Sequence, residues 1–215
     1  ASRLVEQKWS LKSIHRLIVT SATYRQSGTV DDDRRAKDPD NVLLWHRRPT
    51  RLEGEVIRDA VLAASGRLDT QMYGTSVVNA DSTRRSIYLR VKRSEPEAFL
   101  RVFDQPEPLQ SVGARGVATV PTQALTMMNA PLVRSAAAGL AERARKAAGG
   151  TGAAAIEYCF TVALSRKPSA DDTARFTDFL AAREAAAGGD DAKRQAALAD
   201  ACHLMLCLNE FVYVD

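Results

Sequence analysis

The chain has 215 residues, enough for one domain with a substantial core or for two small ones. Its hydrophobic content of 45% and charged content of 26% are ordinary for a globular protein, and no apolar run is long enough for a membrane span. Three cysteines, Cys159, Cys202 and Cys207, are too few and too scattered to imply a disulfide framework. These features exclude a transmembrane domain and a disulfide-rich scaffold.

The first predicted helix lies in the opening stretch of the chain. Ser10 can cap it, apolar positions in residues 11–22 recur at helical spacing, and Gly28 ends it. We expect these apolar residues to form a core helix. Arg25 and Gln26 project from its exit turn, and both are candidates for bridging to the next helix.

A second helix is predicted over residues 51–65. Thr50 and Glu53 have the spacing of a capping box, and Gly66 is a natural stop. A stripe of alternating charge runs along this helix, whose other faces are apolar; its members are Arg51, Glu55, Arg58 and Asp59.

Two interpretations of the charged stripe stay open. The favoured one is a structural ion-pair network, mostly buried, that holds the helix against Arg25 or the basic segment described below. Removal of Glu55 would then cost about 3–5 kcal/mol. The alternative is a cleft in which Glu55 or Asp59 handles a proton or binds sugar hydroxyls while arginines fix an acidic group. Such a cleft would gather Arg25 and Gln123 around a concave pocket.

A basic segment follows the second helix. Residues 84–101 carry a net charge of +4, which equals the net charge of the whole chain. Such a strip can bind phosphate or an acidic polymer, although basic runs are more often solvated faces. The candidate anion-binding residues are Arg84, Arg85, Arg90, Lys92 and Arg93. Alternating apolar and polar residues also predict a strand near 86–93, paired with residues 72–78 or 99–103.

From Pro121 onward the pattern is wholly helical. Helices are expected over residues 121–129, from Pro131 to the glycines at 149–152, around 156–163, from Ser169, and through 198–208. The predicted fold class is mainly α, a multi-helix bundle with a small β element and long loops. We expect a single helical domain over residues 1–215, with room for a sub-boundary near 105–120, where prolines break regular structure.

Strong catalytic and metal-binding signatures are missing from the sequence. His15, His46 and His203 lie far apart, and no H-E-x-x-H, C-x-x-C or G-x-S-x-G motif occurs. Cys202, His203 and Cys207 share a predicted helix but point in different directions, so they cannot converge on one metal ion without ligands from elsewhere in the chain. We expect no metal and no other cofactor in this chain, and we expect the two cysteines to pack in the core.

A series of long, ordered motifs covers most of the chain: WSLKSIHRLIVTSATYRQS, DPDNVLLWHRRPTRLEGEVIRDAVLAASGRLD, RRSIYLRVKR, FDQPEP, VPTQALTMMNAPLV, ALSRKPSADD and LNEFVYVD. Together they resemble the planctomycete PSD family nearly end to end. The resemblance implies a domain of unknown function near the C-terminus of a large secreted bacterial protein. A cytochrome c-like domain commonly lies upstream in such proteins, which implies export to the periplasm or cell surface and haem c in the parent chain.

The chain departs from the family pattern at several points. Only LVEQKW remains of an opening helix of the HPELLDWLA type, so we expect a truncated N-terminus. No C-x-x-C-H is present, and any haem therefore belongs to the missing part. Gly54 stands where the family more often has alanine, and a glycine inside a helix costs about 0.5–1 kcal/mol relative to alanine.

Two functions follow as expectations. The favoured one is a non-catalytic helical module that packs against upstream domains of the same chain and binds a partner such as an acidic polymer or polysaccharide; nucleic acid is not an expected partner. The alternative is part of an extracellular enzyme, active on polysaccharide and coupled to a c-type haem domain. A catalytic cleft would gather the polar residues around a pocket, whereas an interaction module would present an apolar patch or a basic face.

Overall fold

A computed structural model describes residues 1–78, 81–188 and 190–214 of the chain. These residues form two compact units. Unit 1 is built from Ala1–Thr50 and the end of the chain from Tyr213 onward, and unit 2 from Arg51–Val212. The line between the units falls at Thr50, outside the 105–120 segment, and a single domain over the whole chain stays a prediction.

Unit 1 holds three short helices, α1 (Ser2–Glu6), α2 (Leu11–Val19) and α3 (Asp32–Lys37). Ser10 caps α2 as predicted, because its hydroxyl accepts from the Ser13 N–H at 3.3 Å. The expectation that α2 is a core helix is wrong, since none of its residues is buried. The helices of unit 1 are 5, 9 and 6 residues long, which is too short for them to enclose a core.

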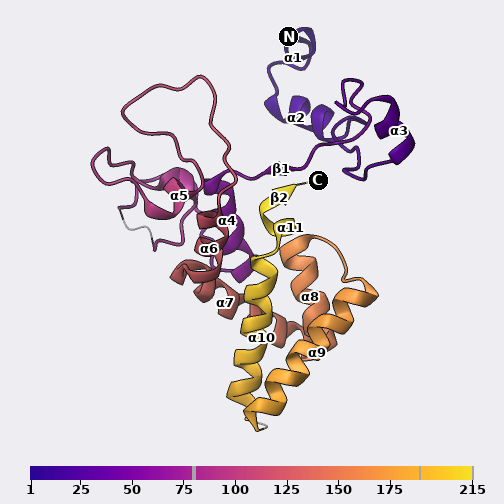
Figure 1. The fold of residues 1–215 in the computed structure, drawn as a ribbon. Coiled ribbons are helices and arrows are strands. Elements are labelled where there is room, and N and C mark those ends of the chain that lie inside the picture. Colours follow the sequence, from indigo (N-terminus) through magenta and orange to yellow (C-terminus); the bar gives the residue numbers. More distant parts are fainter. Residues whose placement is uncertain (79–80, 189, 215) are drawn as a thin grey trace. The chain divides into compact units, whose positions relative to one another are not determined.

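Unit 2 contains the other α-helices of the described residues, the longest ones among them (Figure 1). They are α4 (Gly54–Ser65), α5 (Ala98–Val102), α6 (Pro121–Asn129), α7 (Pro131–Ala148), α8 (Ala153–Leu164), α9 (Ala170–Ala187), α10 (Asp191–Leu206) and α11 (Asn209–Val212). The helices predicted from Pro121 onward are confirmed. At the start of α9, Ser169 and Asp172 form a capping box in which they exchange hydrogen bonds. In the described ranges, no helix is long and apolar enough to cross a membrane.

The core of unit 2 is centred on α7. Helix α10 packs along α7, and α9 packs along α10 (Figure 1). Four of the six buried residues of α7 are alanines, so the neighbouring backbones can approach closely. The buried Cys159 and Cys202 face each other in this core with their sulfur atoms 3.3 Å apart. Cys207 is half-buried and packs against the core, so the expected core packing is complete for Cys202 and partial for Cys207.

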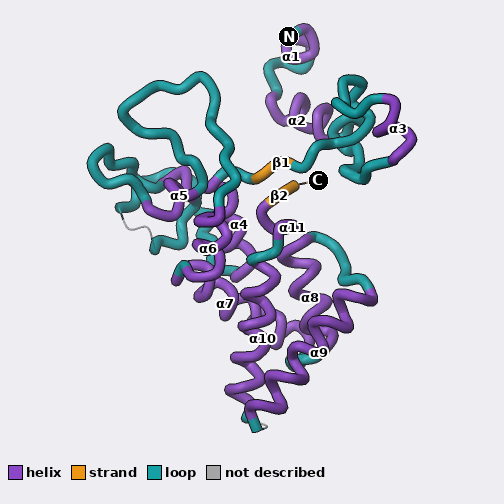
Figure 2. Tube along the Cα trace, in the orientation of Figure 1, coloured by secondary structure: helices purple, strands orange, loops and turns teal. Residues whose placement is uncertain are grey.

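The mainly α class with a small β element is confirmed, but the β element is not where the sequence placed it. It is formed by β1 (Thr50–Arg51) and β2 (Tyr213–Val214). Within the predicted strand near 86–93, the structure has a 3-10 turn at Ser86–Tyr88 and a single parallel bridge between Val77 and Leu89. The alternating pattern does not mark two faces of a sheet here, because Ile87 is 74% exposed. Figure 2 shows that loops make up most of the chain between α4 and α6.

Helix α4 begins at Gly54, and the predicted capping box of Thr50 and Glu53 does not form. Thr50 lies in β1, whose extended backbone keeps its hydroxyl from the helix start, and Thr50 Oγ1 donates to the carbonyl of Arg48 at 3.2 Å. The predicted stop is confirmed: Gly66 ends α4 with a φ of +76°, in the left-handed region that favours glycine.

Gly54 allows α5 to approach the first turn of α4. A Cβ at this position would lie 2.9 Å from Phe103 Cβ and 3.5 Å from the Leu100 backbone. Because Gly54 starts the helix and does not lie inside it, the propensity cost expected from sequence is smaller than the cost of separating these two helices.

We therefore predict that Gly54→Ala destabilises the protein. The added methyl group forces α5 or Phe103 to move, and overpacking of this kind typically costs about 1–3 kcal/mol. The free energy of unfolding, measured with urea, is expected to fall by this amount. Gly113→Ala is the matched control, because a Cβ there meets nothing within 4 Å. A Gly54→Ala protein as stable as the parent would show that propensity outweighs packing at this site.

Candidate functional site

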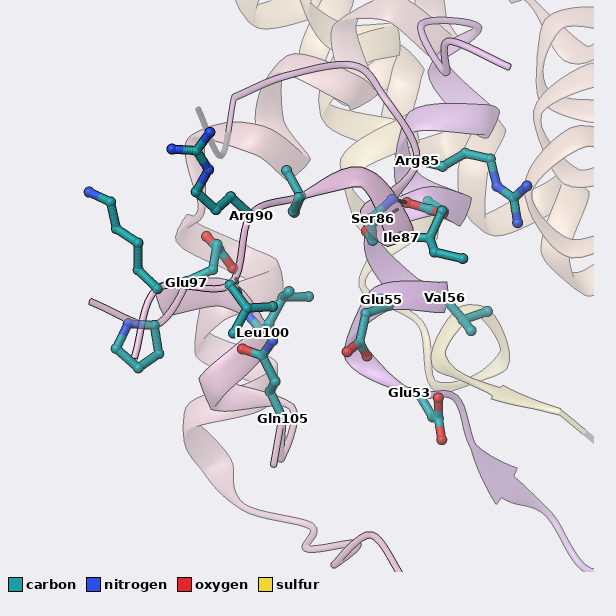
Figure 3. A pocket seen from close by; sticks show the side chains of 15 residues that line it. Glu53, Glu55, Val56, Arg85, Ser86, Ile87, Arg90, Glu97, Leu100 and Gln105 are labelled. Carbon is teal, nitrogen blue, oxygen red and sulfur yellow. Dashed lines mark hydrogen bonds between the residues drawn. The ribbon is translucent and has the colours of Figure 1, made fainter. Parts of the chain in front are cut away.

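A cavity of about 440 Å³ in unit 2 brings together polar groups from three parts of the chain (Figure 3). Figure 3 shows Glu53 and Glu55 on one side of it, with Leu100 and Gln105 opposite. Its polar and charged lining residues are Glu53, Glu55 and Asp59 from the start of α4, Arg85, Ser86, Arg90 and Lys92 from the basic segment, and Glu97 and Gln105 from either side of α5. The lining of the cavity therefore mixes carboxylates with cations, and part of it is apolar.

Glu55 is held by an arginine from the loop between α5 and α6. Arg115 donates to both carboxylate oxygens of Glu55, at 2.6 and 2.8 Å, and lies 3.0 Å from a carboxylate oxygen of Glu53. These hydrogen bonds from Arg115 lower the pKa of Glu55 below its ordinary value, although burial opposes the shift. Glu55 therefore stays ionised well below neutral pH, which makes it a poor proton donor.

Arg51 and Gln123 fix the two ends of the same loop. Arg51 donates to Asp104 at 2.5 Å, and the same carboxylate oxygen accepts from the Ala118 N–H at 2.8 Å. Gln123 is buried, and its amide nitrogen donates to the carbonyls of Val102 and Ala118, at 3.0 and 3.1 Å. Neither Arg51 nor Gln123 lines the cavity.

Arg58 and Asp59 hold the stretch that precedes and begins the 3-10 turn. The side chain of Arg58 is 1% exposed, and its guanidinium donates to the Arg84 carbonyl at 3.0 Å and also to the Ser82 carbonyl. Asp59 accepts from the Ser86 N–H at 2.8 Å and from the Ser86 hydroxyl at 2.7 Å. Burial lowers the pKa of Arg58, and the nearby Asp59 carboxylate opposes this shift.

The basic segment divides into one arginine used inside the fold and several exposed cations. The guanidinium of Arg84 donates to the carbonyls of Gln71, Tyr73 and Thr75 and stacks on the Tyr88 ring with its carbon 4.0 Å from the ring centroid. The exposed cations are Arg85, Arg90, Lys92 and Arg93. Arg101, at the end of the segment, is exposed as well. These exposed cations can meet an external anion, although Lys92 forms an ion pair with Glu95 at 3.0 Å.

Arg25 and Gln26 belong to unit 1. Arg25 is exposed, and the side-chain nitrogen of Gln26 donates to the Leu44 carbonyl at 2.7 Å within that unit. Their bridging role toward the second predicted helix stays a prediction. Of the members of the proposed polar cluster that belong to unit 2, Glu55 and Asp59 line the cavity, whereas Arg51, Arg58 and Gln123 do not.

Sequence reasoning missed the two loop residues that neutralise the stripe, Arg115 and Asp104. Both lie in irregular segments, where no periodicity marks which residues face a neighbouring helix. The one available signal was the isolated arginine between Gly113 and Gly116 in a stretch otherwise poor in charge.

The thiols of Cys202 and Cys207 are not activated as nucleophiles, and His203 makes a structural contact. The hydrogen bond with Cys159 and burial raise the pKa of Cys202, and burial raises the pKa of Cys207. Both thiols therefore stay protonated near neutral pH, and the thiolate is the nucleophilic form. The ring nitrogen Nε2 of His203 lies 3.1 Å from the Met127 carbonyl oxygen, a structural contact between α10 and α6.

We predict that Glu55→Ala lowers the free energy of unfolding by about 1.5–3 kcal/mol, the usual value for hydrogen bonds to a charged group. The cost is below the 3–5 kcal/mol expected from sequence for a buried pair, because the Glu55 side chain is 29% exposed and Arg115 is 24% exposed. Since the folded-state pKa of Glu55 is lowered, its contribution is complete above the ordinary value of 4.5 and is lost as the pH falls below it. The difference in free energy of unfolding between the parent and Glu55→Ala should therefore become smaller as the pH falls below 4.5.

Glu107→Ala is the control for this measurement, because Glu107 is an exposed carboxylate in the loop between α5 and α6 that also carries Arg115. It should unfold like the parent. A Glu55→Ala protein that also unfolds like the parent, yet loses ligand binding or turnover, would contradict the structural reading and support a catalytic cleft.

Comparison with known proteins gives a family. A family model described as PSD1, a protein of unknown function (DUF1553), matches residues 1–180. No curated protein and no solved structure matches the chain. The match spans most of the sequence and agrees with the PSD resemblance carried by its motifs, so the chain belongs to the PSD1 family of proteins of unknown function.

Proposed function

We propose that this chain is a non-catalytic helical module of an exported multidomain protein, and that it packs against neighbouring domains of the same protein. The export, and a c-type haem domain upstream, are supported by the family resemblance alone. The non-catalytic role is supported by the charged stripe on α4, because Glu55 is paired with Arg115 and Asp59 with Ser86. Groups engaged in this way contribute to holding the fold.

The observation that carries the proposal is the exposed strip at residues 85–93, which we call the basic rim. Its apolar side chains, Ile87 and Val91, are 74% and 60% exposed. They lie in the same stretch as the exposed cations Arg85, Arg90, Lys92 and Arg93. Apolar side chains interleaved with arginine are typical of protein interfaces, and a local excess of positive charge favours an acidic partner surface.

The basic rim predicts a measurable difference between this chain and the longer protein. In hydrogen exchange, the amides of residues 85–93 should exchange more slowly in the longer protein than in the isolated chain, because the partner domain covers them. Ile87→Ser combined with Arg90→Gln should remove that protection.

Leu125→Ser combined with Arg145→Gln is the matched control, since Leu125 is 53% exposed and both residues lie outside the basic rim. Equal exchange of residues 85–93 in the two proteins would contradict packing through this surface. Turnover of a polysaccharide that depends on Glu55, in a variant that remains folded, would replace the proposal with the enzyme alternative.

A further inference from the structure

A second cavity, of about 600 Å³, lies within unit 1 and has a different chemical character. It is formed by the exit of α2 and by the segment that leads to β1. Its lining residues are Thr23, Tyr24, Gln26, Asn41, Leu44, His46, Arg47, Arg48 and Thr50. The lining thus holds two guanidinium groups, an imidazole, hydroxyls and amides, but no carboxylate.

The segment that carries His46 is organised by its own polar residues. Asn41 is buried with a φ of +55°, and its side-chain nitrogen donates to the His46 carbonyl at 2.8 Å. The Asp38 carboxylate accepts from the N–H groups of Val42 and Leu43, at 3.0 and 2.8 Å. Trp45 Nε1 donates to the Asp38 carbonyl at 3.0 Å. Both oxygens of the Asp38 carboxylate therefore already accept hydrogen bonds from backbone N–H groups.

Three contacts attach this segment to the exit of α2. The Gln26 side chain donates to the Leu44 carbonyl at 2.7 Å, and the Arg47 N–H donates to the Ser27 carbonyl at 3.1 Å. The Arg47 guanidinium carbon lies 5.3 Å from the centroid of the Tyr24 ring. The cavity wall is thus held in place before any ligand arrives, which reduces the ordering cost of binding.

The cations in this cavity keep unused hydrogen-bonding capacity. In the described ranges, neither Arg47 nor Arg48 forms an ion pair with a carboxylate, and Arg48 donates instead to the Asp40 carbonyl. The Nδ1 atom of His46 is buried and has no hydrogen-bond partner. A buried polar atom without a partner is costly, and a ligand atom that pairs with it removes that cost.

We infer that this cavity binds a small ligand with an oxyanion group on a hydroxylated body. A planar guanidinium matches carboxylate, sulfate and phosphate geometry, and two of them in one lining without an acid select for negative charge. Thr23, Gln26 and Thr50 supply hydrogen bonds for hydroxyl groups, and the volume falls within the usual range for small-molecule sites. The site does not depend on the proposed packing role, because the basic rim belongs to unit 2.

The test is a titration of the 15N-labelled chain followed by NMR, at constant ionic strength maintained with sodium chloride. The probes are D-glucuronate, glucose 6-phosphate, inorganic sulfate, inorganic phosphate and neutral D-glucose. The amides of residues 21–28 and 41–50 should shift in a saturable way with the two sugar-borne anions, more weakly with the inorganic anions, and not with D-glucose. Arg47→Gln and Arg48→Gln should each weaken binding about tenfold or more, as expected for loss of a charge-assisted hydrogen bond.

Arg35→Gln is the matched control, because it removes the same charge from an exposed position on α3 in unit 1. It should bind like the parent. Arg47→Lys keeps the charge and should retain part of the affinity, which separates loss of the anion contact from misfolding. The inference is overturned if no oxyanion gives a saturable shift, if Arg35→Gln weakens binding as much as Arg47→Gln does, or if D-glucose binds as tightly as D-glucuronate. Equal affinity for sulfate and the sugar-borne anions would overturn the assigned hydroxylated body.

Discussion

A guanidinium group cannot be buried without hydrogen-bond partners, and Arg58 places its whole side chain in the interior of unit 2 with 1% exposure. The stretch from Ser82 to Ser86 satisfies this requirement with backbone carbonyls, while Asp59 on the same helix anchors Ser86. The position of this stretch then fixes Arg84, whose guanidinium organises the preceding loop through the carbonyls of Gln71, Tyr73 and Thr75. One buried cation on α4 thus determines where a long irregular segment lies.

The other charged residues of α4 and the strand before it act in the same way on the loop between α5 and α6. Arg51 pairs with Asp104 at the beginning of that loop, and Glu55 pairs with Arg115 within it. A loop in this position has no ladder of backbone hydrogen bonds to hold it, so these side-chain pairs supply its attachment. The cavity beside Glu55 is bounded by the segments that α4 holds, which explains why polar residues from separate parts of the chain gather there.

The parts of the fold that could be predicted from the sequence are those in which several signals lie within a few residues of one another. Helices α6 to α10 were predicted because apolar periodicity, a proline start at Pro121 and the capping pair at Ser169 act within a few residues. The prediction that α2 is a core helix was wrong, because periodicity reveals an apolar face but not whether another element covers that face. The prediction of a strand near 86–93 was wrong, because the contact of Ser86 with Asp59 spans 27 residues and cannot be recognised from the local sequence pattern. The charged stripe was recognised as a set, but its partners Asp104 and Arg115 lie 53 and 60 residues from Arg51 and Glu55, in loops without periodicity.

The claim that charged residues on α4 hold the irregular segments of unit 2 is tested most directly by hydrogen exchange on Arg58→Met. Methionine fills a similar volume without the charge, so the change removes the hydrogen bonds but leaves little cavity. The account predicts that the amides of Asp69, Val77, Ser86 and Arg90, which hydrogen-bond to loop groups or Asp59, exchange faster. In Arg58→Met, the order of exchange rates among the amides of α7 and α10 should stay the same. In the exposed control Arg145→Met, the exchange rates of all these amides should match those of the parent. Unchanged protection of those loop amides in Arg58→Met would contradict the account, because the loops would then hold their positions without the buried cation.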